Sequence, residues 1–141
     1  MKKKVLCIIP ARKGSKGLKN KNIKMLNKIP LIAWSILVAK KCKQIDEIIV
    51  STDSIKISKI AKTYGAKVPF IRPKKFATDK ASSFSVLKHA IDFFKEKKRY
   101  FDYILMLEPT SPLRHFRDID FCLTKVKNKN IQTLVSVAKT I

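Results

Sequence analysis

The sequence has few acidic residues, few glycines and no long apolar segment. Asp and Glu total 10 against 32 Lys and Arg, which gives a formal net charge of +22 over 141 residues. Three glycines are too few for a fibrous protein. No apolar run approaches the roughly 18 residues that a membrane-spanning helix needs. The apolar run after the basic N-terminus ends at Pro10, too early for a signal peptide. We therefore expect a cytoplasmic protein with no membrane partner.

Cysteine and histidine are also scarce. An odd number of cysteines without a close pair argues against a disulfide framework and against a zinc site. Cys7, Cys42 and Cys122 each lie among apolar neighbours, so we expect three buried thiols. His89 and His115 are far apart and belong to no cluster, which argues against a metal centre or a catalytic triad.

The excess of positive charge raises the possibility of nucleic-acid binding. Only five of the basic residues are arginine, and the lysines are spread along the whole chain. No segment interleaves aromatic and basic residues, so nucleic-acid binding is an alternative and not the primary prediction. One concentration stands out: ten basic residues lie between Lys2 and Lys28, ahead of the first acid at Asp46.

Apolar runs alternate with segments of helical spacing along the chain. Strands are expected at residues 5–9, 47–51, 67–71, 103–107 and 133–137. Helices are expected at residues 30–38, 55–61, 83–97 and 116–126, the second capped by Asp53 or Ser54. This alternation predicts one α/β domain with a mostly parallel sheet flanked by helices. The polar loops 11–22, 51–54 and 108–114 should gather at the carboxyl edge of that sheet, where such folds bind ligands.

The loop at residues 11–22 is the strongest single signal. Gly14 and Gly17 allow backbone N–H groups to approach an anion closely. Ser15 and Asn22 add neutral donors, and the loop carries five cations. These cations are Arg12, Lys13, Lys16, Lys19 and Lys21. The pattern is neither a P-loop nor a dinucleotide fingerprint. It predicts a polyphosphate cradle, with a solvated basic loop as the alternative.

Four ordered blocks of sequence carry a family resemblance. Residues 9–22 read Ile-Pro-Ala-Arg-Lys-Gly-Ser-Lys-Gly-Leu-Lys-Asn-Lys-Asn, which closely resembles the signature of the acylneuraminate cytidylyltransferase (CMP-N-acetylneuraminic acid synthetase) family. The blocks at residues 51–54, 72–83 and 108–114 match in the same order. The resemblance covers essentially the whole chain. It implies a Rossmann-like nucleotidyltransferase fold, with residues 1–141 forming a single domain whose C-terminal part is missing.

The resemblance also implies an activity. Enzymes of this family transfer CMP from CTP to an acidic nine-carbon nonulosonic sugar and release pyrophosphate, with Mg²⁺ as the expected cofactor. The implied partners are CTP and the sugar acid, in the service of lipopolysaccharide or other glycan synthesis. Family members form homodimers, and the dimer segment is expected to be missing here. A related transferase for another base or sugar, and an inactive fragment of such an enzyme, remain alternatives.

Residue roles follow from the resemblance block by block. Arg12 and Lys21 are the expected catalytic residues, holding the triphosphate and the charge of the leaving pyrophosphate. The expected nucleotide-binding residues are Ala11, Arg12, Gly14, Ser15, Lys21, Asn22, Arg72, Ala81, Ser82 and Ser83. The expected sugar-binding residues are Glu108, Thr110 and Ser111. Arg72 could instead be an exposed strand-end residue, and Ser82 and Ser83 could simply cap the following helix.

One residue departs from the family pattern, which usually has Gln at the position of Glu108. A carboxylate there would repel an acidic sugar, so we expect Glu108 to tune the choice of sugar or to help bind Mg²⁺. The family's paired metal-binding aspartates are expected beyond the end of this chain. We therefore expect the 141-residue chain to bind CTP weakly and to turn over very slowly.

Overall fold

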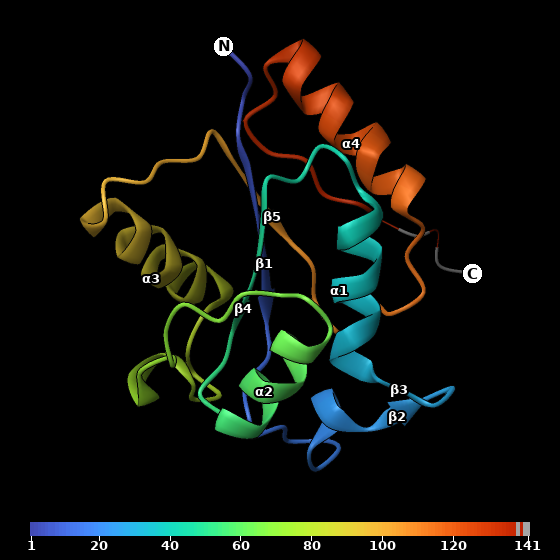
Figure 1. Cartoon of the computed structure of the whole chain (residues 1–141), viewed down its shortest axis with the longest axis vertical. Helices are drawn as coiled ribbons and strands as arrows, with labels where there is room; N and C mark the ends of the chain where they lie inside the picture. Colours follow the sequence, from blue (N-terminus) through green and yellow to red (C-terminus); the bar gives the residue numbers. More distant parts are fainter. Residues whose placement is uncertain (138, 140–141) are drawn as a thin grey trace.

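The computed structural model describes residues 1–137 and 139, and its centre is a three-stranded parallel sheet (Figure 1). Strand β1 (Val5–Pro10) lies between β4 (Glu47–Ser51) and β5 (Tyr103–Met106). Residues 5–9 have no solvent-exposed surface. A strand covered on both faces needs apolar side chains at every position, which explains the uninterrupted apolar run. The predicted parallel sheet is confirmed.

Helices cover both faces of this sheet. They are α1 (Leu31–Lys41), α2 (Ile55–Thr63), α3 (Ser83–Glu96) and α4 (Phe116–Lys129). Alternate side chains of β1 point to opposite faces. Val5, Cys7 and Ile9 join a core with α1, α2 and α4, whereas Leu6 and Ile8 pack with α3. Figure 1 shows α3 on one side of the sheet and the other helices on the opposite side.

A small hairpin connects the basic loop to α1 and has no counterpart in the predicted elements. A short 3-10 helix, η1 (Lys21–Ile23), precedes antiparallel β2 (Met25–Leu26) and β3 (Ile29–Pro30). The two turn residues, Asn27 and Lys28, both have positive φ, as a tight two-residue hairpin requires. Another 3-10 turn, η2 (Lys74–Phe76), lies ahead of α3.

Two expected strands do not form. Residues 67–71 make only one bridge, between Lys67 and Ile49, because Pro69 has no N–H to extend a ladder. Residues 133–137 are not a strand either, and no strand among the described residues pairs with them. Val135 and Val137 are 73% and 91% exposed, so the apolar run there does not mark a buried element.

Two of the three cysteines are buried as the sequence predicts. Cys7 and Cys42 are buried thiols as predicted, but Cys122 is only half-buried, because it lies on the outer part of α4. None of the helices in the described part of the chain combines the length and the apolar character needed to cross a bilayer.

His89 on α3 packs inside an aromatic cluster next to the segment that leads into this helix. Its ring lies edge-on to Phe70, with centroids 4.7 Å apart, and 5.0 Å from the ring of Phe76. Its buried Nδ1 atom has no hydrogen-bond partner in the described part of the chain. Burial, followed by the nearby charge of Arg72, lowers the pKa of the His89 imidazole. The folded protein therefore favours the neutral ring.

We predict that His89 makes folding stability depend on pH. The unfolded imidazole has a pKa of about 6.5 and the folded one a lower pKa, so the unfolded state binds more protons between the two values. This contribution is complete above pH 6.5 and declines as the pH falls below it. Urea unfolding at pH 7.5 and 5.5 should show a smaller pH difference for His89→Leu than for the wild type. An equal difference would contradict the prediction.

Candidate functional site

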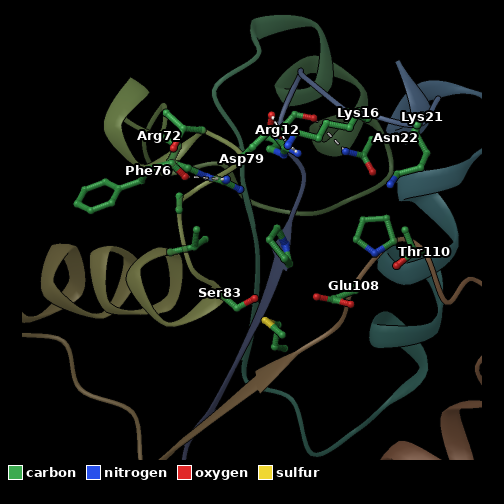
Figure 2. Close-up of a pocket in the computed structure, with 18 residues that line it drawn as sticks. Arg12, Lys16, Lys21, Asn22, Arg72, Phe76, Asp79, Ser83, Glu108 and Thr110 are labelled. Carbon is green, nitrogen blue, oxygen red and sulfur yellow. Dashed lines mark hydrogen bonds and ion pairs between the residues drawn. The ribbon is translucent and has the colours of Figure 1, made fainter. Parts of the chain in front are cut away.

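A hollow of about 390 Å³ lies at the carboxyl edge of the sheet, which is a volume suited to a small-molecule ligand (Figure 2). Its walls come from the loop after β1, the segment 72–83 and the loop after β5. Nine of the predicted site residues line it, and they come from all three walls. They are Arg12, Ser15, Lys21, Asn22, Arg72, Ala81, Ser83, Glu108 and Thr110.

The other predicted residues do not line the hollow. Ala11 is buried in the core, and its N–H donates to the Ser51 carbonyl at 2.9 Å. Ser82 caps α3 by accepting a hydrogen bond from the Ser85 N–H at 3.1 Å, so the capping alternative is confirmed for this residue. Gly14 and Ser111 belong to the flanking loops, and Ser111 donates its N–H to the Glu108 carbonyl at 3.2 Å.

Two polar side chains hold the main chain of the basic loop. Asn22 is 7% exposed and donates from Nδ2 to the Arg12 carbonyl at 3.1 Å. Asp53 accepts a hydrogen bond from the Lys13 N–H at 2.7 Å. Of the two proposed caps of α2, Ser54 is the one that forms, accepting from the Ile57 N–H. Asp53 therefore holds the basic loop in place and does not cap α2. The sequence alone did not decide between Asp53 and Ser54 as the cap.

Arg12 is paired with an acid of the opposite wall. Its Nη2 lies 2.5 Å from Oδ1 of Asp79, and Nζ of Lys16 lies 3.5 Å from Oδ2 of the same carboxylate. The hydrogen bond from Arg12 holds the pKa of the Asp79 carboxyl below its usual range. Asp79 lies in the third block of the resemblance but was not among the predicted site residues. The sequence did offer a clue, because Asp79 is the only acidic residue in the block 72–83.

Arg72 is a buried residue, so the alternative of an exposed strand-end residue is wrong. Its side chain donates from Nε to Ser51 Oγ at 3.0 Å, from Nη2 to the Ser51 carbonyl, and from Nη1 to the Phe76 carbonyl at 3.2 Å. Burial lowers the pKa of its guanidinium to about 10, which leaves it charged at neutral pH. Arg72 thus ties the end of β4 to the wall that carries Asp79.

Arg114, which like Asp79 was not among the predicted site residues, fixes the third wall. Arg114 donates from Nη2 to the Glu108 carbonyl at 2.7 Å and from Nη1 to Ser35 Oγ at 3.2 Å. The side chain of Glu108 lies apart from the Arg12–Asp79 pair in Figure 2. It forms no ion pair within the described residues, so its carboxylate remains available to a ligand or a cation.

The described residues do not form a metal site of their own. They contain no group of three or more His, Cys, Asp and Glu side chains that could hold an ion. Asp79 is occupied by Arg12 and Lys16, which leaves Glu108 as the carboxylate of the hollow that could join a metal shell. Mg²⁺ usually takes one or two carboxylates together with substrate phosphates. These residues alone therefore fit Mg²⁺ only in part.

The parallel sheet with a basic loop at its carboxyl edge defines an α/β domain of the nucleotidyltransferase type. The family model described as "Cytidylyltransferase" matches residues 6–141, and the chain belongs to this family. An N-acylneuraminate cytidylyltransferase of Escherichia coli O18:K1:H7 is 41% identical over 144 residues, covering 99% of this chain. A CMP-N,N'-diacetyllegionaminic acid synthase of Legionella pneumophila is 41% identical, covering 79% of it. A pseudaminic acid cytidylyltransferase of Campylobacter jejuni is 42% identical, covering 78%.

The chain spans 32% to 48% of the length of these three relatives. Among solved structures, a CMP:2-keto-3-deoxy-manno-octonic acid synthetase complexed with CTP aligns with a TM-score of 0.74 at 23% identity. The alignment covers 90% of this chain and 48% of the solved one. A 4-diphosphocytidyl-2C-methyl-D-erythritol synthase aligns with a TM-score of 0.70 at 10% identity, covering 91% of this chain and 56% of that one. These likenesses confirm the nucleotidyltransferase fold.

We predict that Arg72 contributes mainly to stability. Replacing it with Met removes three donors and leaves the buried Ser51 hydroxyl without its Arg72 partner, whereas the Ser51 carbonyl keeps the Ala11 N–H. We expect this to cost about 1–3 kcal/mol of the free energy of unfolding. Arg117→Met, at an exposed arginine of α4, is the matched control and should change it little. Urea unfolding of both variants measures the effect. An Arg72→Met protein as stable as the wild type would refute this role.

Proposed function

We propose that the chain provides the nucleotide-binding part of an enzyme that transfers CMP from CTP to a nonulosonic sugar acid and releases pyrophosphate. The observation that carries the proposal is the hollow at the carboxyl edge of the sheet, where the loop after β1 brings Arg12 and Lys21 to one wall. Membership of the cytidylyltransferase family supports CTP as the nucleotide. The names of the relatives support a nine-carbon sugar acid as the acceptor.

The roles of the walls follow from their chemistry. Arg12 offers a planar fork and Lys21 a point charge, and both types of cation bind phosphate oxygens. In the transfer, the anomeric hydroxyl oxygen of the sugar acid attacks the α-phosphorus of CTP and gives up its proton to solvent. The bond between the α-phosphorus and the α,β-bridging oxygen breaks, and this oxygen leaves with the pyrophosphate. Negative charge then grows on the departing pyrophosphate. Cations already fixed beside it stabilise that charge without reorganisation.

Base and sugar are assigned to the two other walls. Ala81 and Ser83 line the hollow from the start of α3, and we assign them to the cytidine portion of the nucleotide. Glu108 and Thr110 line it from the loop after β5, and we assign them to the acceptor sugar. Mg²⁺, when bound with the triphosphate, would neutralise part of its charge, and Glu108, a carboxylate of the hollow that forms no ion pair among the described residues, could contact it. For the complete enzyme, the resemblance further implies a homodimer that serves lipopolysaccharide or other glycan synthesis. These points, and the cytoplasmic location expected from the sequence, stay predictions.

We predict that the chain binds CTP in preference to GTP, and that Arg12→Ala weakens CTP binding roughly 10- to 100-fold, the value of a lost charge-assisted hydrogen bond. Titration calorimetry with Mg²⁺ present measures both quantities. Arg117→Ala removes an exposed arginine that does not line the hollow and should bind CTP like the wild type.

Single-stranded RNA separates this proposal from the nucleic-acid alternative. Binding to RNA that is tight, steeply salt-dependent and insensitive to Arg12→Ala, without any preference for CTP, would support a basic nucleic-acid-binding module instead. A folded chain that binds none of these ligands would identify it as an inactive fragment of the enzyme.

Glu108 generates a separate prediction for the complete enzyme. Replacing it with Gln removes one negative charge from the wall assigned to the acidic sugar. The KM for the sugar acid should fall or the Mg²⁺ concentration needed for half-maximal rate should rise, depending on which ligand the carboxylate meets. Steady-state rates at varied sugar and varied Mg²⁺ distinguish the two. If both parameters stay unchanged, Glu108 has neither role.

A further inference from the structure

The Arg12–Asp79–Lys16 cluster bridges two walls of the hollow and is not explained by the proposed transfer reaction. Asp79 directs its two oxygens at two different cations, Oδ1 at Arg12 and Oδ2 at Lys16 (Figure 2). A carboxylate oxygen and a phosphate oxygen make the same kind of charge-assisted hydrogen bond to a guanidinium or an ammonium group. Asp79 therefore occupies the Arg12 donor that the proposed function assigns to a phosphate, together with the neighbouring ammonium group of Lys16.

The segment that carries Asp79 is firmly fixed at its ends and little packed in between. Arg72 holds its start through the Phe76 carbonyl, and Ser82 fixes its end as the cap of α3. Between them, residues 78–80 are exposed, and the internal backbone hydrogen bond runs from the Ala81 N–H to the Thr78 carbonyl at 3.2 Å. A short exposed segment with few buried contacts can shift at small cost.

The ion pair itself is also weak enough to exchange. The side chains of Arg12 and Asp79 are 31% and 39% exposed, so water competes for both partners. Exposed ion pairs of this kind contribute little to the free energy of folding. Stabilisation of the fold alone therefore does not account for the position of Asp79 opposite Arg12. A triphosphate carries several negative charges and can displace a single carboxylate from the same donors. A neutral ligand cannot.

We propose that Asp79 is a counter-ion gate: in the nucleotide-free protein its carboxylate takes the phosphate position on Arg12 and Lys16, and it must leave when a polyphosphate binds. The proposal rests on the proposed function, because it assumes that phosphate groups reach Arg12. Its consequence is selectivity. A ligand with a single phosphate gains less binding free energy on displacing Asp79 than a triphosphate does. Weakly charged anions therefore bind less well to Arg12 and Lys16.

Calorimetric titration of the wild type and Asp79→Asn with CTP, inorganic pyrophosphate and cytidine tests the gate. The amide retains the shape but not the charge of the carboxylate. Asp79→Asn should bind CTP and pyrophosphate about two- to fivefold more tightly, the range expected for releasing one exposed ion pair, and cytidine equally well. Asp79→Glu keeps the charge and should bind all three nearly like the wild type.

Two controls separate the gate from a general change in charge. Asp92→Asn removes another ion-paired acid, which lies on α3 and does not line the hollow, and should leave the affinity for CTP unchanged. In an Arg12→Ala background, Asp79→Asn should give a smaller gain than in the wild type, because the pair it breaks is already absent. An equal gain in that background would overturn the gate.

The outcomes separate the gate from the proposed function. CTP binding that is unchanged or weakened in Asp79→Asn overturns the gate, with weakening meaning that Asp79 orients Arg12, while the proposed function stands. Tighter pyrophosphate binding together with equal affinities for CTP and GTP supports the gate and refutes the preference for cytidine. If neither protein binds CTP or pyrophosphate, both proposals fail.

Discussion

The parallel pairing of β1 with two neighbours is the constraint on which the rest of the molecule depends. Because residues 5–9 are wholly buried, this strand cannot shift without exposing apolar side chains on both faces. Its register sets Pro10 beside Ser51 and Ile8 beside Met106. The chain therefore leaves all three strands at one edge, and the three loops that follow have to meet there. The hollow is a consequence of strand direction.

Strand pairing brings the loops together, but polar side chains give them their shape. Asn22 and Asp53 hold the main chain of the basic loop, Arg72 joins β4 to the segment before α3, and Arg114 holds the loop after β5. All four act on backbone groups, which would otherwise be free to adopt other conformations. The hydrogen bonds of these residues are made to other parts of the protein, so these groups are not free to bind a ligand. Lys21 and the carboxylate of Glu108 lie on the same hollow and form no ion pair among the described residues.

The sequence alone predicted those features that depend on residues close together in the chain. The apolar run of β1, the helical spacing of α3 and the glycine-containing basic loop were all readable, and so was the edge where the loops meet. The run 67–71 misled because Pro69 limits its pairing with β4 to one bridge. The run 133–137 misled because hydrophobicity does not reveal whether a neighbouring strand is available among the described residues. The burial of Arg72 depends on a contact with Ser51, 21 residues away, and no local pattern encodes it. The same holds for the pairing of Asp79 with Arg12.

The large positive charge bears on the positions of Asp79 and Glu108 in the hollow. A net charge of +22 attracts every polyanion, and a cradle of bare cations would bind phosphate compounds without much discrimination. Acids positioned near the cations add discrimination, because they compete with an incoming anion for the same donors. Asp79 neutralises part of the cradle, and Glu108 contributes a negative charge to the wall assigned to the sugar. If the hollow binds a polyphosphate as proposed, long-range attraction accelerates encounter, and the two carboxylates help to determine which anions bind tightly.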